Sequence, residues 1–435
     1  MKRFLVLITF IFLTTFAYSQ NVINLFNKAN NFFYYLDAAQ FDSAHVFIDN
    51  NEKSKITPEL LKQIWEETIT KNGKIKSLQP IQSKVQGDFF SVTLEGVFEN
   101  DNQNFILFFN KAENIVGIFS PPKPASYKPA VYADTTKFSQ TSTYLGEGNK
   151  QLAAILTVPK NTKNFPIVIF VHGSGPSDMD MTVGANKPFK DIAEGLAAQG
   201  IASIRYVKRT LVYSGDFSGA FTVKEEVLND VDLAIEVAKK VNGVDAKQIY
   251  LYGHSLGGML VPKVAESKSE VKGIIISAAP ARILTDIMVD QNKAAVARLN
   301  DTSATIQNEL TKAIKMLDAT RISSLDGIKA DSLIVGLPAS YWVSLNTIDQ
   351  VGITQKLKKK VLVIHGGNDF QVGKIDFDIW EKQLSNQKLA TTKFYPDLNH
   401  LLSEQSEMGT TAQYQVPANV SEQLIKDIAA WIKLK

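Results

Sequence analysis

Cysteine is absent from all 435 residues of the sequence. Its absence excludes disulfide bonds, thiolate metal sites, a cysteine nucleophile and a lipid on an N-terminal cysteine. Histidine is scarce, with five residues, so few side chains can act as a general base that titrates near neutral pH. A nucleophile in this chain therefore cannot be a thiol, and its partner base must come from a short set of imidazoles.

A strong charge of either sign is also absent. The net charge is +3 with neutral histidines, which gives no electrostatic footprint for nucleic acid or for an anionic membrane surface. Hydrophobic residues make up 45% of the chain and charged residues 21%, as in ordinary globular proteins with a full core. We predict no nucleic-acid partner, and the length indicates two globular units.

The first 19 residues have the pattern of a signal peptide. Lys2 and Arg3 precede an apolar run from Phe4 to Phe16, and Ala17 and Ser19 fit the small-residue rule for cleavage after Ser19. The alternative is a membrane anchor, but the run is shorter than the roughly 20 residues that span a bilayer. We expect an exported protein, periplasmic or secreted from a bacterium, with no membrane span in the mature chain.

Residues 20–120 are expected to form a small α+β domain, because predicted helices precede predicted strands. The helices are Val22–Phe41 and Thr57–Thr70, the second of which opens at the capping pair Thr57-Pro58. The strands are Phe89–Leu94, Asn104–Phe109 and Ile115–Phe119. The run Pro121-Pro122-Lys123-Pro124 then breaks regular structure, so residues 121–131 are predicted to be a linker.

Residues 132–435 alternate strands with helices, which is typical of a doubly wound α/β domain. The strands are short, largely apolar runs of the kind that form a parallel sheet buried on both faces. They are Ile167–Val171, Ala202–Tyr206, Gln248–Tyr252, Lys272–Ser277, Lys360–Ile364 and Thr391–Tyr395. The interval of about 80 residues before Lys360 is too long for a plain crossover, and we predict a helical lid at about 279–355.

The sequence Gly253-His254-Ser255-Leu256-Gly257 matches the G-x-S-x-G turn that presents a nucleophilic serine. A predicted strand precedes it and a predicted helix follows it, as this sharp turn requires. Glycines permit the turn because a side chain would clash there. The helix N-terminus behind Ser255 would face developing negative charge. We predict that Ser255 is the nucleophile.

His400 is the predicted general base. Hydrolases built on this turn carry their catalytic residues in the chain order Ser, Asp or Glu, His, with the histidine in the loop beyond the last strand. His400 lies in that loop, whereas His365 ends a core strand and is the weaker rival. His172 and His254 belong to glycine turns that they brace, and His45 lies in the small domain.

Asp369 is the predicted acid, because it follows the strand Lys360–Ile364 at its carboxyl end. There it could orient the imidazole of His400 and stabilise its protonated form. Asp376 and Asp378 are close rivals, but they fall where the next helix should begin, and N-capping explains them better.

Two backbone N–H groups are predicted to form an oxyanion hole. One belongs to Leu256, the residue after the nucleophile, and the other to Ser174 in the turn His172-Gly173-Ser174-Gly175-Pro176. Such a glycine turn after a strand could instead hold phosphate. Since no G-K-[ST] follows it, a phosphate-binding loop is the poorer interpretation.

Several stretches together resemble a bacterial family of exported α/β-hydrolases that carry an N-terminal NTF2-like domain of uncharacterised function. The resemblance covers nearly the whole chain after the linker, and in the first domain it rests only on helix and strand order. The matching stretches are 172–176, 184–189, 205–210, 253–258, 279–282, Tyr341-Trp342, 367–372 and 395–401.

The resemblance implies an α/β-hydrolase fold with a helical lid, and carboxylesterase activity on short acyl or acetylated substrates. Some relatives are described as serine aminopeptidases. The resemblance implies neither a metal nor an organic cofactor. Ser255, Asp369 and His400 take the triad positions. The chain departs from the family at Val207, where relatives carry an acidic residue, which puts in doubt a salt bridge that would position Arg209.

Three functions therefore stay open. The main one is hydrolysis of a small-molecule ester through an acyl-enzyme. A peptidase would need lid carboxylates to hold a substrate ammonium, and Asp286, Asp290 and Asp301 are available. The third is a non-catalytic binding protein, whose small domain captures a glycan, lipid or cell-wall fragment; that domain could equally serve packing or dimerisation.

Tyr341 and Trp342 either line the substrate pocket or anchor the lid as core residues. Oligomeric state is left open.

Overall fold

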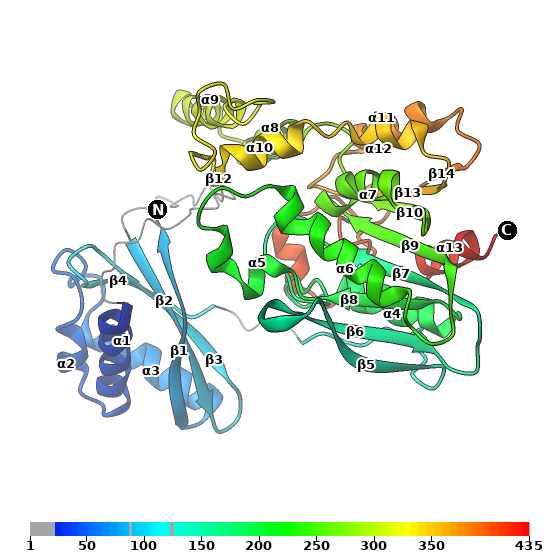
Figure 1. Cartoon of the computed structure of the whole chain (residues 1–435). Helices are drawn as coiled ribbons and strands as arrows, with labels where there is room; N and C mark the ends of the chain where they lie inside the picture. The colour runs from blue at the N-terminus through cyan, green and yellow to red at the C-terminus, as the bar shows by residue number, and fades with distance from the viewer. Residues whose placement is uncertain (1–21, 87–88, 122–125, 435) are drawn as a thin grey trace. The chain divides into compact units, whose positions relative to one another are not determined.

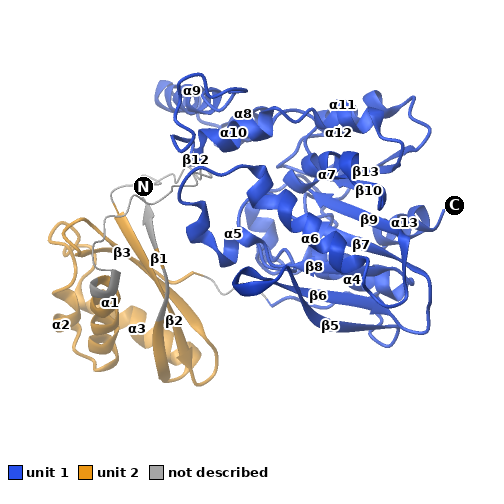
Figure 2. Ribbon diagram, viewed as in Figure 1, with its two compact units in different colours: residues 1–12, 124–435 blue, residues 13–123 orange. Residues whose placement is uncertain are grey.

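The computed structural model describes residues 22–86, 89–121 and 126–434. The chain divides between residues 123 and 124 into two compact units, each with its own core (Figure 2). The predicted signal peptide, residues 1–19, lies outside the described residues. Within the described ranges, no helix combines the length and the apolar character needed to cross a membrane.

The smaller unit packs helices against one antiparallel sheet, in which the strands follow the order β1-β2-β3-β4 (Figure 1). Its helices are α1 (Val22–Asp37), α2 (Phe41–His45) and α3 (Pro58–Asn72), and its strands are β1 (Ile75–Gln86), β2 (Phe89–Phe98), β3 (Gln103–Phe109) and β4 (Ile115–Phe119). The side chain of Thr57 accepts the N–H of Leu60 and so caps α3 as expected.

Strand β1 was not expected from the sequence. It is polar and contains Pro80, which cannot donate a hydrogen bond to a sheet ladder. A proline is tolerated here because β1 is an edge strand, and its register against β2 shifts between Pro80 and Gln82. Pairing with β2, rather than the pattern of β1 itself, explains why this segment is extended.

Aromatic rings from the helices and the sheet form the core of the smaller unit. Phe33 of α1 lies with its ring centroid 4.7 Å from that of Phe105 on β3 and 5.8 Å from that of Trp65 on α3. Trp65 also lies 6.2 Å from Phe98 on β2. Such tilted aromatic contacts add to the free energy of apolar burial.

The larger unit is built on one eight-stranded sheet with the order β14-β13-β10-β9-β7-β8-β6-β5. Strands β5 and β6 pair antiparallel with their neighbours, and the other six are parallel, as the sequence predicted for those six. The strands are β5 (Phe138–Leu145), β6 (Leu152–Pro159), β7 (Phe165–Val171), β8 (Ala202–Tyr206), β9 (Val244–His254), β10 (Val271–Ser277), β13 (Lys360–Gly366) and β14 (Ala390–Tyr395).

Helices cover both faces of this sheet, so the central strands are apolar throughout. All seven residues of β7 are buried, and alternate side chains point to opposite faces. Ile167 and Ile169 join the core beneath α6 and α7, whereas Val168 and Phe170 join the core beneath α4 and α13. These helices are α4 (Pro188–Ala198), α6 (Asn229–Ala238), α7 (Leu256–Ser267) and α13 (Glu422–Lys433), with the short α5 (Arg209–Val212) and α12 (Lys374–Leu384) completing the layers.

The long insertion between β10 and β13 folds as the expected helical lid. Figure 1 shows α8, α9 and α10 gathered at the top of the larger unit, away from the sheet. The lid contacts the loop after β13, where Gln291 donates its side-chain N–H to the carbonyl of Gln371 at 2.8 Å. Its elements are α8 (Leu284–Arg298), α9 (Ala304–Asp318), β11 (Leu333–Ile334), β12 (Leu337–Pro338), α10 (Ala339–Asn346) and α11 (Gln350–Lys356).

The aromatic core of the smaller unit gives a testable prediction. Trp65→Ala should lower the free energy of unfolding of this unit by about 3–5 kcal/mol, because it leaves a cavity among Phe33, Phe98 and Phe105. Hydrogen exchange of β2 and β3, measured by mass spectrometry on the full chain, would report the loss. Tyr34→Ala, at a side chain that is 67% exposed, is the control. Equal protection in both variants would contradict the assignment of this core.

Candidate active site

Ser255 stands on a sharp turn between β9 and α7. Its backbone adopts φ 54° and ψ −120°, a conformation that residues other than glycine rarely adopt and that costs free energy. A Cβ on Gly253 would lie 2.4 Å from the carbonyl oxygen of Gly257, and a Cβ on Gly257 would lie 2.2 Å from that of Val171. Both glycines are therefore required by the close approach of backbone to backbone.

The turn brings Ser255 to the N-terminus of α7, which starts at Leu256. The first N–H groups of a helix have no partner within the helix and carry partial positive charge. The N–H of Ser255 is bonded to the carbonyl of Ser277 at the end of β10, at 2.9 Å, so two strands hold the turn. An anion forming beside Ser255 would therefore meet favourably oriented dipoles.

Asp369 and His400 form the central polar contact of this region. Nδ1 of His400 lies 2.7 Å from Oδ2 of Asp369, and both residues are buried. Oδ1 of Asp369 accepts the N–H groups of Gln371 and Val372 at 2.8 and 2.9 Å. Burial works to raise the pKa of Asp369, but the charge of His400 and the hydrogen bonds to the carboxylate lower it overall. In the neutral ring, a proton on Nδ1 that is donated to Asp369 leaves the lone pair on Nε2.

A second contact brings the loop of His400 next to the turn of Ser255. Nε2 of His254, the residue before Ser255, is hydrogen-bonded to the carbonyl oxygen of His400 at 2.8 Å, and the two rings lie 4.6 Å apart. The loop itself is held by Asn399, whose side-chain oxygen accepts the N–H of Leu401 at 2.9 Å. Loops after β9, β13 and β14 thus meet at the carboxyl edge of the parallel strands.

The remaining histidines make structural contacts. Burial lowers the pKa of His172 to about 4 and that of His254 to about 3, so both rings are neutral at pH 7. His172 bonds to the carbonyl of Tyr206 at 2.7 Å, and His365 bonds to that of Val372 at 3.1 Å. His45 bonds to a carbonyl of the smaller unit at 3.3 Å. His172 and His254 brace loops, as the sequence suggested.

The two rival carboxylates do not cap the helix that follows them, contrary to the expectation. Gly373 is the N-cap of α12. Asp376 instead accepts the N–H of Ala281 at 2.9 Å and pairs with the guanidinium of Arg282 at 2.7 Å, so it fixes the start of the lid. Asp378 is about half exposed and pairs with Lys374 on the same helix. The contact of Asp376 with the start of the lid could not be predicted from the local sequence, because the two segments lie far apart in the chain.

The loop after β7, which carries Ser174, lies against the nucleophile turn. A Cβ on Gly173 would be 3.2 Å from Cβ of Ser255. Nζ of Lys208 donates to the carbonyl of Gly173 at 2.8 Å and also pairs with Glu226. Lys208 was predicted only as part of the matching stretch 205–210, and Glu226 was not predicted at all, because a buried charged pair cannot be recognised before its partners are known.

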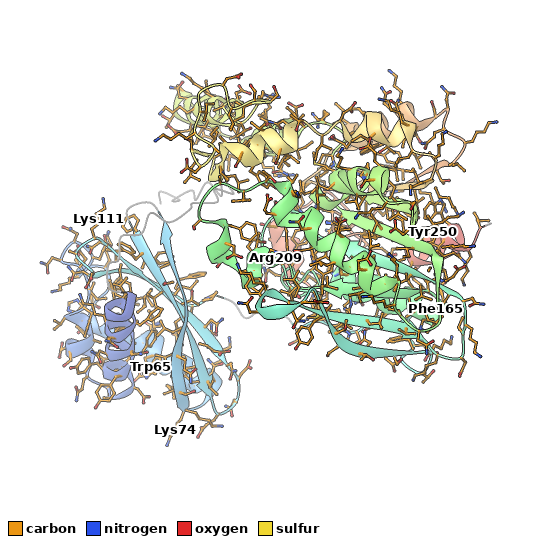
Figure 3. The ribbon with its side chains drawn as sticks, in the orientation of Figure 1. Trp65, Lys74, Lys111, Phe165, Arg209 and Tyr250 are labelled. Atoms are coloured by element: carbon orange, nitrogen blue, oxygen red, sulfur yellow. The ribbon has the colours of Figure 1, made fainter. Side chains whose placement is uncertain are left out.

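Arg209 has a different partner from the one that the family pattern suggested. The side chain of Arg209 is labelled in Figure 3. Its guanidinium binds Asp230 of α6, with N–O distances of 2.6 and 2.9 Å, and Val207 beside it is apolar and buried. Burial raises the pKa of Asp230 to about 6, although Arg209 acts in the opposite direction. A salt bridge therefore positions Arg209 despite the departure at Val207.

Tyr341 and Trp342 belong to α10 of the lid, and their side chains are buried in the core. They are 3% and 1% exposed, and Nε1 of Trp342 donates to the carbonyl of Ile334 at 2.7 Å. The ring of Tyr341 lies 5.5 Å from that of Phe221. Burial and the charge of Glu226 raise the pKa of the Tyr341 phenol. These contacts favour the anchoring role over the pocket-lining one.

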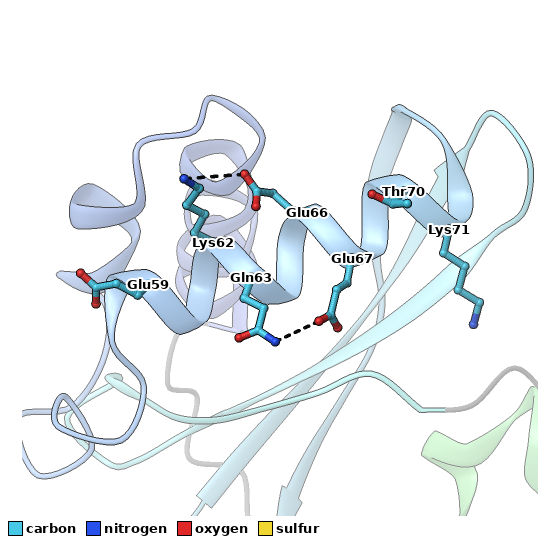
Figure 4. Close-up of a pocket in the computed structure, with 7 residues that line it drawn as sticks. All are labelled: Glu59, Lys62, Gln63, Glu66, Glu67, Thr70 and Lys71. Atoms are coloured by element: carbon cyan, nitrogen blue, oxygen red, sulfur yellow. Dashed lines mark hydrogen bonds and ion pairs between the residues drawn. The ribbon is translucent and has the colours of Figure 1, made fainter.

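A hollow lies along the exposed face of α3 in the smaller unit (Figure 4). Its side chains pair along the helix, Lys62 with Glu66 at 3.9 Å and Gln63 with Glu67 at 3.0 Å. Such pairs are typical of a solvated helix face. Among the residues that the structure describes, no group of three or more His, Cys, Asp or Glu is placed to hold a metal ion.

The mostly parallel sheet, the helical lid and the serine on a strand-to-helix turn define an α/β hydrolase. Residues 163–407 match the family model described as serine aminopeptidase, S33, and residues 29–118 match the model of a protein of unknown function, DUF3887. The chain belongs to the S33 serine aminopeptidase family of α/β hydrolases, with a DUF3887 domain before the catalytic one.

Individual relatives are esterases by name. Esterase EstD of Thermotoga maritima is 30% identical over 404 residues, which cover 92% of this chain and 93% of the relative. Among solved structures, Est1E of Butyrivibrio proteoclasticus is 19% identical, with a TM-score of 0.43 over 68% of this chain and 99% of its own. An esterase of Pyrococcus furiosus is 13% identical, with a TM-score of 0.41 over 72% and 98%.

The lowered pKa of Asp369 predicts a pH-dependent contribution to stability. A carboxylate whose pKa is lower in the folded protein stabilises the fold above its unfolded-state pKa, and this contribution is lost as the pH falls through the folded-state pKa, below 3.8. Asp369→Asn should therefore lower the free energy of unfolding at pH 7 by about 1.5–3 kcal/mol. The difference from wild type should shrink as the medium is acidified.

Denaturant unfolding over a pH series would measure this difference. Asp378→Asn is the control, because that carboxylate is about half exposed and should change stability by less than about 0.5 kcal/mol. A deficit of Asp369→Asn that is the same at every pH would show that the charge of Asp369 is not responsible.

Proposed function

We propose that this carboxylic ester hydrolase acts through an acyl-enzyme on Ser255, with His400 as general base and Asp369 as the acid that orients it. The enzyme class itself follows from the family and from the relation to EstD over nearly the whole chain. The observation that carries the residue assignment is the 2.7 Å bond between His400 and Asp369, in a loop that is tied to the residue before Ser255.

In the first half-reaction, Oγ of Ser255 attacks the acyl carbon of the ester while its proton passes to Nε2 of His400. The contact between Oγ and Nε2 is part of the proposal. The bond between the acyl carbon and the alcohol oxygen then breaks, and the alcohol oxygen accepts the proton from Nε2. The alcohol leaves, and the acyl group stays on Ser255.

In the second half-reaction, a water molecule takes the place of the alcohol. Nε2 of His400 accepts a proton from the water as its oxygen attacks the acyl carbon. Collapse of this second intermediate releases the carboxylic acid and returns the proton to Oγ of Ser255. Asp369 stays ionised throughout, which the lowered pKa of its carboxyl supports.

The oxyanion of each intermediate would be held by the N–H groups of Leu256 and Ser174. Leu256 is the first residue of α7, and the Ser174 loop lies against Ser255. Donors that are fixed before the reaction stabilise developing charge without reorganisation, and one such donor is worth roughly 10²–10³ in rate.

The lid carboxylates favour an ester over a peptide with a free amino group. Asp286 pairs with Arg321 at 2.7 Å, Asp290 pairs with Arg282 at 2.9 Å, and Asp301 accepts the N–H of Ser303. Carboxylates that are already neutralised by arginine are poor partners for a substrate ammonium. We therefore place short acyl or acetyl esters ahead of aminoacyl substrates.

We also propose export to the periplasm or the exterior of a bacterial cell, on the pattern of residues 1–19 alone. A role of the smaller unit in binding substrate, or in packing and dimerisation, remains an expectation from its position in the chain, as does its NTF2-like character.

Removal of the nucleophile gives the direct test. Ser255→Ala should reduce turnover of short p-nitrophenyl esters by at least roughly 10⁴-fold, because no other group can form the acyl-enzyme, while circular dichroism stays unchanged. Ser142→Ala, on the exposed edge strand β5, should retain wild-type turnover. Residual wild-type activity in Ser255→Ala would show that Ser255 is not the nucleophile.

Substrate choice separates the esterase from the peptidase and from a binding protein. The wild-type chain should hydrolyse p-nitrophenyl acetate with a kcat/KM at least about tenfold above that for aminoacyl p-nitroanilides, because Asp286 and Asp290 of the lid are already paired with arginine. A preference for the anilides would reverse the order of the two activities. Failure of a fluorophosphonate to label Ser255 would favour the binding protein.

A further inference from the structure

The buried pair Lys208 and Glu226 adjoins the candidate active site but has no part in the triad. Lys208 follows β8, and Glu226 lies in the π-helical turn Lys224–Leu228 before α6. The two side chains are 2% and 6% exposed and form an ion pair. A buried ion pair is costly to desolvate and often gives no net stability, so its presence beside a reactive serine calls for a functional explanation.

Lys208 is connected to the loop that carries Ser174. Besides Glu226, its Nζ contacts the carbonyl oxygen of Gly173 at 2.8 Å. Its backbone N–H donates to the carbonyl of Ser177 at 3.0 Å, and His172 is bonded to the carbonyl of Tyr206, two residues before Lys208. The segment after β8 therefore holds the Ser174 loop at three points.

The contact with Gly173 determines the direction of one particular N–H. The carbonyl of Gly173 and the N–H of Ser174 belong to the same peptide group, which is planar and trans, so they point in opposite directions. A cation that binds the carbonyl oxygen fixes this plane and directs the N–H away from Lys208. It also polarises the peptide, which makes the N–H a stronger donor.

We propose that Lys208 is a positioning residue that fixes and polarises the Ser174 N–H for the oxyanion, and that Glu226 holds Lys208 in place. The inference rests on the proposed function, since it assigns a support to one of the two oxyanion donors. The lid contributes to the same device. Ser344 of α10 accepts the N–H of Val223 at 3.1 Å, and Ser340 donates to the carbonyl of Phe221 at 2.8 Å, so α10 holds the segment that leads to Glu226.

Four proteins test this role: wild type, Lys208→Met, the double variant Lys208→Met/Glu226→Gln, and Arg209→Met as a matched control. Arg209→Met also breaks an ion pair with a buried carboxylate, that of Asp230, but in the described part of the chain no hydrogen bond joins Arg209 to the Ser174 loop. For Lys208→Met, the kcat for p-nitrophenyl acetate should fall roughly 10- to 100-fold, with KM changed less than about threefold. The Ki of a trifluoromethyl ketone that mimics the oxyanion should rise by a similar factor.

The double variant distinguishes positioning from mere stability. Replacing both charges removes the unpaired carboxylate, so the Tm should return toward wild type, whereas kcat should stay low because the contact with Gly173 is still missing. Recovery of kcat together with Tm would overturn the inference, and so would an equal loss of kcat in Arg209→Met. If a fluorophosphonate fails to label wild-type Ser255, the proposed function fails as well. Labelled wild-type enzyme with unchanged kcat in Lys208→Met overturns this inference alone.

Discussion

The close approach of backbone to backbone at the Ser255 turn is the constraint on which the rest of the site depends. The carbonyl oxygens of Gly257 and Val171 lie where a Cβ at positions 253 and 257 would be, so the turn exists only because both are glycine. Ser255 then takes a strained backbone conformation at the start of α7. The parallel strands on either side supply the rigidity that maintains this strain, since their side chains are buried on both faces.

Four pairs in the larger unit each contain a buried carboxylate, and each pair joins segments that lie apart in the sequence. Asp369 contacts His400, Asp376 pairs with Arg282 at the start of the lid, Asp230 pairs with Arg209, and Glu226 pairs with Lys208. A buried charge is tolerated only where a partner and hydrogen bonds replace water. The pairs therefore hold together loops that have little regular secondary structure of their own. In an α/β hydrolase such pairs position the donors and the base before a substrate arrives, which is how a site gains rate from preorganised dipoles.

The family relation and the geometry answer different questions. The relation to EstD extends over both units and indicates ester hydrolysis, whereas the arginine partners of Asp286 and Asp290 are the geometric basis for our proposal that an ester is preferred over a substrate with a free amino group. The DUF3887 unit keeps its own aromatic core, so its contribution to function is a separate question from the chemistry at Ser255.

The sequence by itself determined the six parallel strands and the serine turn, because these depend on local periodicity and glycine chemistry. Chain order gave the prediction of Asp369 and His400, whose side chains lie in contact in the structure. The sequence did not reveal β1 or β5, polar edge strands that become extended only through pairing with a neighbour, or β6, which lies between β5 and β8. Tertiary structure alone decided that Asp376 serves the lid entrance, that Tyr341 and Trp342 lie in the core, and that Lys208 reaches Gly173. Each of these depends on a partner far away in the chain, and a contact energy between distant residues leaves no mark on the local pattern of either one.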